Sequence, residues 1–215
     1  MEIRPELPTD ASSVRRVHRI AFGDHGQVVG ELVADLRQLL TTETGLSYVA
    51  VEGSEVVGHI LFTPAVLDAP RELVAVQVLS PLAVLPTCQG SGVGSALVTM
   101  GIQIMAARSV PVVFLEGDPD YYSRFGFLSG EHHCFRRPSL RIPKPAFQAL
   151  TLPSYESWMT GTLVYPDAFW RHDAVGLRGA DRVAEWSDGR DESPAGPPQR
   201  RPDLRDGPAR LALDS

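Results

Sequence analysis

Apolar positions along the chain recur with two periods, and each period predicts a different kind of element. Near the start, residues 2–6 alternate between apolar and polar as a short strand does. Two later stretches repeat at intervals of three and four residues, which is typical of helices with one buried face. The first helix is expected to follow an N-cap at Thr9, and the second to begin near Gln27. Their apolar stripes are Val14, Val17, Ile20 and Ala21 in the first, and Val28, Val29, Leu32, Val33, Leu36, Leu39 and Leu40 in the second.

Three apolar runs of strand length follow these helices. Residues 46–53 and 55–68 meet at Gly53–Ser54, and this turn chemistry predicts an antiparallel hairpin. Residues 72–86 predict a further strand, in which Pro81 has no N–H to donate and should cause a lapse or a bulge in the pairing. Residues 111–117 predict a short buried strand that runs parallel to it, because a helix connects the two.

The remaining pattern predicts shorter elements. Asp118–Pro119 opens a brief helix that ends at Gly126, since proline is favoured in a first helical turn. The stretch FGFLSG resumes as strand, and residues 157–169 are expected to form a closing strand. Together these elements predict an α/β protein with a mixed, mainly antiparallel sheet, a splayed parallel pair of strands at its centre, and flanking helices.

A cluster of glycines lies between two predicted elements, the strand at Leu82–Val84 and a helix whose apolar positions run from Ala96 to Ile104. The first N–H groups of a helix lack internal partners and carry the positive end of its dipole, so this corner predicts an anion site. Neither GxxxxGK[ST] nor GxGxxG is present, and a plain tight turn is the alternative reading. The residues expected to bind the anion are Gln89, Gly90, Ser91, Gly92, Val93, Gly94 and Ser95.

The strand before this corner adds a second feature. Because Pro81 weakens the pairing, the strands that carry Leu82–Val84 and residues 112–115 are expected to splay and leave backbone N–H and C=O groups unpaired. A ligand with its own amides could pair with them as an added strand. Pantetheine has two amides followed by a diphosphate, so Leu82, Ala83 and Val84 are expected to bind the pantetheine arm of acetyl-CoA.

Composition and charge narrow the class of protein. Of the 215 residues, 43% are apolar and 21% are charged, the usual mix for a globular chain. A net charge of −6 without blocks of like charge argues against a nucleic-acid partner. The first ten residues are not signal-like, and no stretch reaches the ~18 apolar residues of a membrane span, so we expect a cytoplasmic protein with no membrane partner.

The pattern changes near Phe169. Residues 1–169 carry the periodic elements and are expected to form one domain, whereas residues 170–215 are rich in Pro, Arg and Asp and predict a loosely ordered tail. Within that tail, residues 174–186 are compatible with either a short docked helix or a strand.

The two cysteines, Cys88 and Cys134, form no CxxC pair, so neither a disulfide framework nor a zinc ribbon is indicated. The stretch His132–Cys134 is read as an ordinary loop, because adjacent residues of an extended chain point to different sides. No metal is expected.

At this point two motifs resemble a known family. LAVLPTCQGSGVGSALV resembles the acyl-CoA-binding motif of the GCN5-related N-acetyltransferases, with Gln89, Gly92 and Gly94 at the matching positions. DPDYYSRFGF resembles their second motif, with Tyr122 four residues before the Gly126–Phe127 pair. The resemblance runs from the first strand to about Phe169 and is narrower to the YhbS-type predicted acetyltransferases. It implies that residues 1–169 are an acyl-CoA N-acetyltransferase domain.

The resemblance also implies a chemistry. A backbone N–H near Leu82–Val84 would polarise the thioester of acetyl-CoA while an amine attacks it directly. Tyr122 would act as general acid on the departing thiolate. No covalent intermediate is needed, so Cys88 is expected to be a filler side chain rather than a nucleophile. The acceptor is a primary amine, either a small molecule or a protein amine, and a homodimer is left open.

Several assignments stay open at the level of sequence. Many family members have an asparagine seven residues before the tyrosine; here that position is Leu115, so the role of the asparagine is unassigned, and Asp118 is a candidate for partial substitution. Glu116 is the candidate base or substrate anchor, with a solvated or helix-capping carboxylate as the alternative. Tyr121 either lines the amine site or packs beneath the short helix. His59 is expected to be a satisfied, half-buried side chain.

The alternatives for function come from other classes of protein. One is a non-catalytic acyl-CoA sensor or regulatory module that keeps the fold without the chemistry. Another is a nucleotide-binding oxidoreductase. Glu31 and Asp35, one helical turn apart, are either an attraction for a cationic amine or simply solvated carboxylates.

Overall fold

One mixed sheet organises the chain, and the computed structural model describes it for residues 1–41 and 43–177. Its nine strands are β1 (Glu2–Pro5), β2 (Leu46–Glu52), β3 (Glu55–Asp68), β4 (Leu73–Val84), β5 (Val112–Glu116), β6 (Leu128–Ser129), β7 (Phe135–Arg136), β8 (Phe147–Thr151) and β9 (Gly161–Val164). Among these described residues the main path runs β1-β2-β3-β4-β5-β8-β6, while β9 pairs with β3 and β7. The pairing of β4 with β5 is parallel, and that of β7 with β9 is too.

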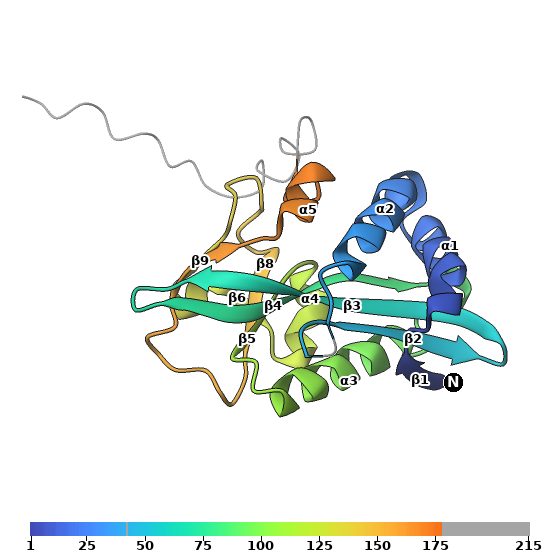
Figure 1. The fold of residues 1–215 in the computed structure, drawn as a ribbon, viewed down its shortest axis with the longest axis horizontal. Helices are drawn as coiled ribbons and strands as arrows, with labels where there is room; N and C mark the ends of the chain where they lie inside the picture. The colour runs from blue at the N-terminus through green and yellow to red at the C-terminus, as the bar shows by residue number, and fades with distance from the viewer. Residues whose placement is uncertain (42, 178–215) are drawn as a thin grey trace, which may run out of the picture.

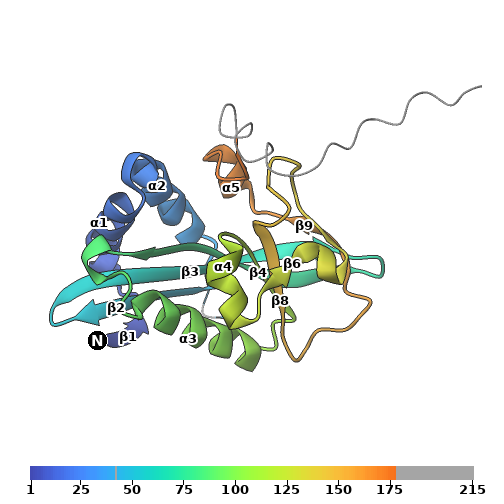
Figure 2. The same ribbon diagram turned by 180° about the vertical axis from the view of Figure 1, so that it is seen from behind.

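Helices cover both faces of this sheet. They are α1 (Ala11–Ala21), α2 (Gly26–Arg37), α3 (Val93–Ala107), α4 (Pro119–Tyr122) and α5 (Asp167–Arg171). Helices α1, α2 and α5 lie on one side of the long β3 and β4 strands, and α3 lies on the other (Figures 1 and 2). The predicted fold class, a mainly antiparallel sheet with a parallel pair at its centre and flanking helices, is therefore confirmed.

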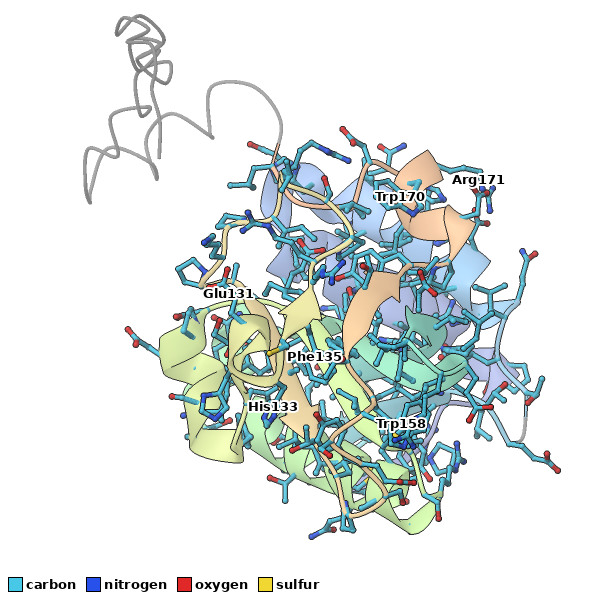
Figure 3. The ribbon with its side chains drawn as sticks, turned by 90° about the vertical axis from the view of Figure 1, so that its left-hand side faces the viewer. Glu131, His133, Phe135, Trp158, Trp170 and Arg171 are labelled. Atoms are coloured by element: carbon cyan, nitrogen blue, oxygen red, sulfur yellow. The ribbon has the colours of Figure 1, made fainter. Side chains whose placement is uncertain are left out.

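Two clusters of buried apolar side chains make the core. One contains Leu97, Val98 and Met105 of α3, together with residues of α1 and of β2 to β5. The other contains Leu32 and Leu36 of α2, Ala168 and Phe169 of α5, and Phe114 of β5. Figure 3 looks onto the end of the molecule where Phe135 and Trp158 lie, and both belong to the second cluster or pack against it.

Most elements expected from the pattern are present where the period is clear. The hairpin joins β2 to β3, with Glu52 opposite Glu55 across the turn. The pairing of β3 with β4 shifts register at Pro81, between Leu79 and Leu82, as the missing N–H of proline predicts. Helix α4 begins at Pro119, and the chain leaves the following turn at Gly126 with a φ of 88°.

Other expectations are wrong. Thr9 caps no helix, because a short 3-10 turn, Pro8–Asp10, precedes α1, and no side chain caps that helix. Ile20, Val28 and Leu39 are exposed although they belong to the predicted apolar stripes. The closing strand ends at Val164, since Asp167 begins α5, and strands β7 and β8 were not foreseen.

The chain continues as packed structure beyond residue 169. Helix α5 runs to Arg171, and Val175 is fully buried in the second cluster. Residues 174–177 form neither helix nor strand, and the rest of the predicted tail, residues 178–215, lies outside the described residues. Within the part of the chain that the structure describes, no helix is long and apolar enough to span a membrane.

A buried polar cluster ties the first two helices to the sheet. His18 of α1 and His59 of β3 are both fully buried, and Nε2 of His18 lies 2.8 Å from Nδ1 of His59. His59 Nε2 lies 2.9 Å from the Ser47 hydroxyl of β2, and Ser47 donates to the carboxylate of Glu6. Glu6 also accepts from Arg37 of α2, with Nε and Oε2 3.0 Å apart. His59 is thus satisfied as expected, but it is fully buried rather than half-buried.

This cluster predicts a specific dependence of stability on pH. Burial, together with the charges of His59 and Arg37, lowers the pKa of His18 from 6.5 to about 2. The unfolded chain therefore binds a proton at His18 below pH 6.5, whereas the folded chain does not until about pH 2, and the free energy of unfolding falls as the pH drops below 6.5. Between pH 7 and pH 5 this one side chain accounts for a loss of roughly 2 kcal/mol.

His18→Gln, which keeps a donor toward His59, should reduce the drop in stability between pH 7 and pH 5 by about that amount, roughly 2 kcal/mol, in urea unfolding measured at both pH values. His25→Gln, at an exposed position, is the matched control and should leave the drop unchanged. Equal drops in the wild type and in His18→Gln would contradict the assignment of a buried, neutral His18.

Candidate functional site

The two central parallel strands, β4 and β5, are paired over only a short stretch. β4 and β5 pair only at Gln77–Val113 and Val78–Phe114. Beyond Val78, β4 remains paired with β3 as far as Val84, while β5 is paired with β8 on its other side. The edge of β4 that faces β5 is therefore open from the Pro81 bulge to Val84, as the sequence predicts.

Alternation along β4 decides which backbone groups face this gap. In an antiparallel pair, every second residue exchanges both hydrogen bonds with its partner, and the residues between them point their N–H and C=O groups the other way. The N–H of Leu85 donates to the Val57 carbonyl of β3, 2.8 Å away. Counting back, Ala83 is turned toward His59 of β3, whereas Leu82 and Val84 are turned toward the gap.

The glycine corner follows directly. Gly90 and Gly92 have φ values of 75° and 94°, a region that side chains oppose, and a Cβ at either position would meet nothing within 4 Å. Gly92 is the N-cap of α3, and no side chain caps this helix. The first N–H groups of α3 are thus free to face an anion, with open space in front of the preceding glycines.

Gly94 is a glycine for a different reason. A Cβ at this position would lie 2.6 Å from the hydroxyl oxygen of Tyr121, so the close approach of the phenol excludes a side chain. Tyr121 is held by neighbours from its own turn, since Arg124 stacks on its ring with 4.0 Å from Cζ to the centroid. Tyr121 also contacts Tyr122 and Phe125 of its own turn, and it lines the same cavity as Gly90 and Gly94.

Tyr122 comes from the next position of α4 and packs differently. Its ring contacts Phe127 edge-on, with 5.8 Å between centroids, and lies against Gly117, where a Cβ would be 2.5 Å from the ring. Burial raises the pKa of the Tyr122 phenol above its ordinary value, and Tyr121 adds to the shift. The phenol is therefore protonated throughout the neutral range and is a potential proton donor.

These features share one cavity of about 390 Å³. Its volume is in the range of small-molecule sites. The structure thus brings together residues from the open strand, the glycine corner and the short helix, which lie up to 40 residues apart in sequence, because α3 and β5 fold back between them. The lining residues are Leu82, Val84, Gln89, Gly90, Gly94, Asp118, Tyr121 and Tyr122.

Some residues predicted to bind the ligand are not among those that line this cavity. Ala83 is turned toward β3 and does not line the cavity, and the Val93 side chain is buried in the core against Gly58. The Ser91 hydroxyl donates to the Cys88 carbonyl, 2.6 Å away, and Ser91, Gly92 and Ser95 are not among the residues that line the cavity. Gln89 lines it, but its amide donates to the Val84 carbonyl at 3.1 Å, so this side chain satisfies one group that the gap leaves open.

Glu116, the last residue of β5, lies on the opposite face of that strand from Tyr122. Its Oε1 accepts from the Tyr165 hydroxyl at 2.9 Å, and its Oε2 accepts from the Gly176 N–H at 3.0 Å. Burial raises the pKa of Glu116, although these two hydrogen bonds and the charge of Arg141 work against the shift. The side chain is thus neither a helix cap nor simply solvated. The cap of α4 is Asp118, which accepts from the Asp120 N–H at 2.9 Å.

The remaining candidates do not form sites. Among the described residues, no group of three His, Cys, Asp or Glu side chains is placed to hold a metal ion. Asp35 accepts from His172 and pairs with Arg171, so it is engaged rather than simply solvated. Cys88 is half-buried against the first core cluster.

Comparison with known proteins shows the family to which the sequence is similar. A family model described as an acetyltransferase (GNAT) domain matches residues 2–129. The uncharacterized N-acetyltransferase YhbS of Escherichia coli strain K12 is 34% identical over 174 residues, which cover 80% of this chain and 99% of YhbS. The uncharacterized N-acetyltransferase YjhQ of the same strain is 38% identical over 119 residues, 55% of this chain. The chain spans only 65% of the length of YjhQ.

Two solved structures resemble the fold with similar identity. The crystal structure of the GNAT family N-acetyltransferase YhbS from Escherichia coli in complex with CoA has a TM-score of 0.69 at 31% identity, and covers 79% of this chain and 92% of that one. A GNAT family acetyltransferase from Brucella melitensis in complex with acetyl-CoA has a TM-score of 0.61 at 33% identity, with 78% and 97% covered.

The contact between Gly94 and Tyr121 predicts a coupled effect on stability. Alanine is favoured over glycine within a helix by about 0.5–1 kcal/mol, but at position 94 the new methyl group would displace the Tyr121 hydroxyl. Gly94→Ala in the wild-type background should therefore gain none of this stability, whereas in a Tyr121→Phe background it should gain about 0.5–1 kcal/mol. Urea unfolding of the four proteins measures the difference, and additive effects would contradict the contact.

Proposed function

We propose that this chain, which belongs to the GNAT family of N-acetyltransferases, binds acetyl-CoA in the gap between β4 and β5 and transfers the acetyl group directly to a primary amine. Family membership rests on the match over residues 2–129 and on the likeness to YhbS over 80% of the chain. The resemblance of the two sequence motifs to this family is thereby confirmed. The relatives solved with CoA and with acetyl-CoA support the choice of coenzyme.

One observation carries the proposal: the open edge of β4, the uncapped start of α3 and the Tyr122 phenol lie along a single cavity. The residues fit the parts of acetyl-CoA in order. The N–H and C=O groups of Leu82 and Val84 suit the amides of pantetheine, and the positive-φ glycines before α3 suit a diphosphate. Gln89 would have to release the Val84 carbonyl if a pantetheine amide takes its place.

The chemistry then divides between backbone and side chain. Bound acetyl-CoA supplies an acetyl group already activated as a thioester, so the amine attacks it without a covalent enzyme intermediate. A backbone N–H of Leu82 or Val84, pre-aligned in the gap, polarises the carbonyl and stabilises the charge that develops on its oxygen. Tyr122, held protonated by burial, donates its proton to the departing sulfur.

Binding of acetyl-CoA can be tested separately from catalysis. Gly92→Val places a branched side chain in front of the start of α3, and its φ of 94° adds a strain of about 1–2 kcal/mol to the folded state. Gly53→Val is the matched control, because Gly53 also has a positive φ, 60°, and open space around it, but lies in the β2–β3 turn.

Both variants should lose similar stability, but only Gly92→Val should weaken acetyl-CoA binding in calorimetry, by about 100-fold or more. In the wild type, acetyl-CoA at 100 times its dissociation constant should raise the free energy of unfolding by about 2.7 kcal/mol. Equal affinity in the two variants would remove the glycine corner from the binding site.

Catalysis is tested at Tyr122. Tyr122→Phe removes only the hydroxyl, and the release of free thiol from acetyl-CoA in the presence of an amine acceptor should fall by about 100- to 10,000-fold. Tyr121→Phe, which removes the neighbouring hydroxyl in the same cavity, is the control and should stay within about tenfold of the wild type. Acetyl-CoA binding without thiol release by the wild type, over a broad amine panel, would instead favour a non-catalytic sensor.

A further inference from the structure

A second cavity opens at the carboxyl end of β5. It has a volume of about 710 Å³, which is the size of a small-molecule site. The walls come from three separate segments: the end of β5 with the turn into α4, the loop before β8, and the chain after α5. The lining residues are Glu116, Gly117, Asp118, Pro119, Pro143, Pro145, Ala146, Ala174, Gly176 and Leu177.

This cavity adjoins the first one across β5. Successive side chains of a strand point to opposite faces. Phe114 and Tyr165, the hydrogen-bond partner of Glu116, pack in the core cluster of α5, whereas Leu115 and Tyr122 pack in that of α3. Glu116 and Tyr122 are therefore on opposite faces of one strand end, and Asp118 lines both cavities.

The charged side chains that line this cavity are all acidic. Two carboxylates, Glu116 and Asp118, face a lining that is otherwise glycine, proline, alanine and leucine, and no Lys, Arg or His is among the described residues that line it. Among the described residues, the positive charge that acts on the pKa of Glu116 is that of Arg141, and Arg141 is itself paired with Asp173 at 3.0 Å. Such a lining favours a cationic group carried on an apolar body, and it opposes a ligand that brings a carboxylate of its own.

The Glu116 carboxylate keeps free acceptor positions for a cationic group. The hydrogen bonds from Tyr165 and Gly176 occupy one acceptor position on each of its oxygens. A carboxylate offers about four such positions, so each oxygen can still accept a proton or a hydrogen bond from an ammonium group. The two donors come from different segments, Tyr165 just after β9 and Gly176 after α5, and together they hold the carboxylate in one orientation.

A rival cavity of about 560 Å³ lies between α1, α2 and α5. Its charges are mixed, since Arg15 and Arg19 stand with Glu31 and Asp35. The Asp35 carboxylate is already engaged with His172, 2.9 Å away, and with Arg171. An ammonium group would therefore be attracted less strongly to this lining than to the lining of the cavity at the end of β5.

We propose that the cavity at the end of β5 binds the acceptor, a primary amine on an uncharged apolar body of small-molecule size, and that Glu116 takes its proton. The inference rests on the proposed acetyl transfer. Glu116 removes one proton from the ammonium group, the amine nitrogen forms a bond to the acetyl carbon, and the carbon–sulfur bond breaks. Tyr122 protonates the sulfur, and the second proton shed by nitrogen restores the Tyr122 phenol. Glu116 returns its own proton to solvent, so one proton is released per turnover.

The test compares matched pairs of amines by free-thiol release from acetyl-CoA. Phenethylamine and tyramine carry an ammonium on an apolar body, and phenylalanine and tyrosine add a carboxylate to the same bodies. We expect kcat/KM to be at least about tenfold higher for each amine than for its amino acid, because the added carboxylate meets Glu116 and Asp118. A lysine-containing peptide is the probe for a protein acceptor and should be poorer than tyramine.

Two variants locate the site. Glu116→Gln should lower kcat/KM for tyramine by about 100-fold or more while the dissociation constant of acetyl-CoA stays unchanged. Glu31→Gln, in the rival cavity, is the matched control and should have no effect. Ala174→Trp places a bulky side chain in the proposed cavity and keeps Glu116 in the sequence, and it should raise KM for tyramine at least about tenfold. Thermal unfolding of each variant verifies that it folds.

The outcomes separate this inference from the function on which it rests. Failure of acetyl-CoA to bind would remove the proposed function itself. If acetyl-CoA binds and thiol is released, a preference for the amino acids or the peptide would overturn the acceptor cavity alone, and so would loss of activity in Glu31→Gln but not in Glu116→Gln. An unchanged KM in a folded Ala174→Trp would do the same. If acetyl-CoA binds but none of the probes releases thiol, the proposed transfer fails and this inference fails with it.

Discussion

The brevity of the contact between β4 and β5 is the constraint on which the site depends. Two paired positions in the middle of β4 hold the strands together, and among the described residues no further ladder pair joins them beyond Val78. A parallel pair that continued would have buried the same backbone groups in a ladder. Because Pro81 disturbs β4 and β5 turns to β8 for its partner, the groups of Leu82 and Val84 face a gap instead.

A gap of this kind needs rigid sides, and the two strands obtain them differently. β4 is held from behind by β3, and β3 is fixed to β2 and both early helices through the buried chain of His18, His59, Ser47 and Glu6. Such a network is useful only when its polar atoms are paired, and most of these are. β5 is held by five register positions with β8 and by the aromatic contacts of Phe114. The gap between β4 and β5 is therefore built into the pairing of the sheet.

Sequence reasoning reached the centre of the fold because its signals there are local. The bulge follows from a proline, the corner from glycines, and α4 from Asp118–Pro119. It failed where partners are distant. β8 shows little alternation and exists because β5 offers it an edge, and α5 was read as strand although Pro166–Asp167 starts a helix. Gln89 and Gly94 line the cavity, but the sequence does not reveal their contacts with Val84 and Tyr121. Glu116 was recognised as a candidate, but Tyr165 and Gly176, which orient it, lie 49 and 60 residues away in sequence.

The hydrogen bond from Gly176 to Glu116 also sets the order in which the molecule can be completed. All strands that form the gap precede residue 117, so that side of the protein can assemble on a growing chain before translation has ended. The carboxylate at the end of β5 acquires its second donor only from Gly176, which lies 60 residues further along the chain. The residues that line the coenzyme cavity thus all lie before residue 123, whereas the opposite side of β5 is completed only by the last described residues of the chain.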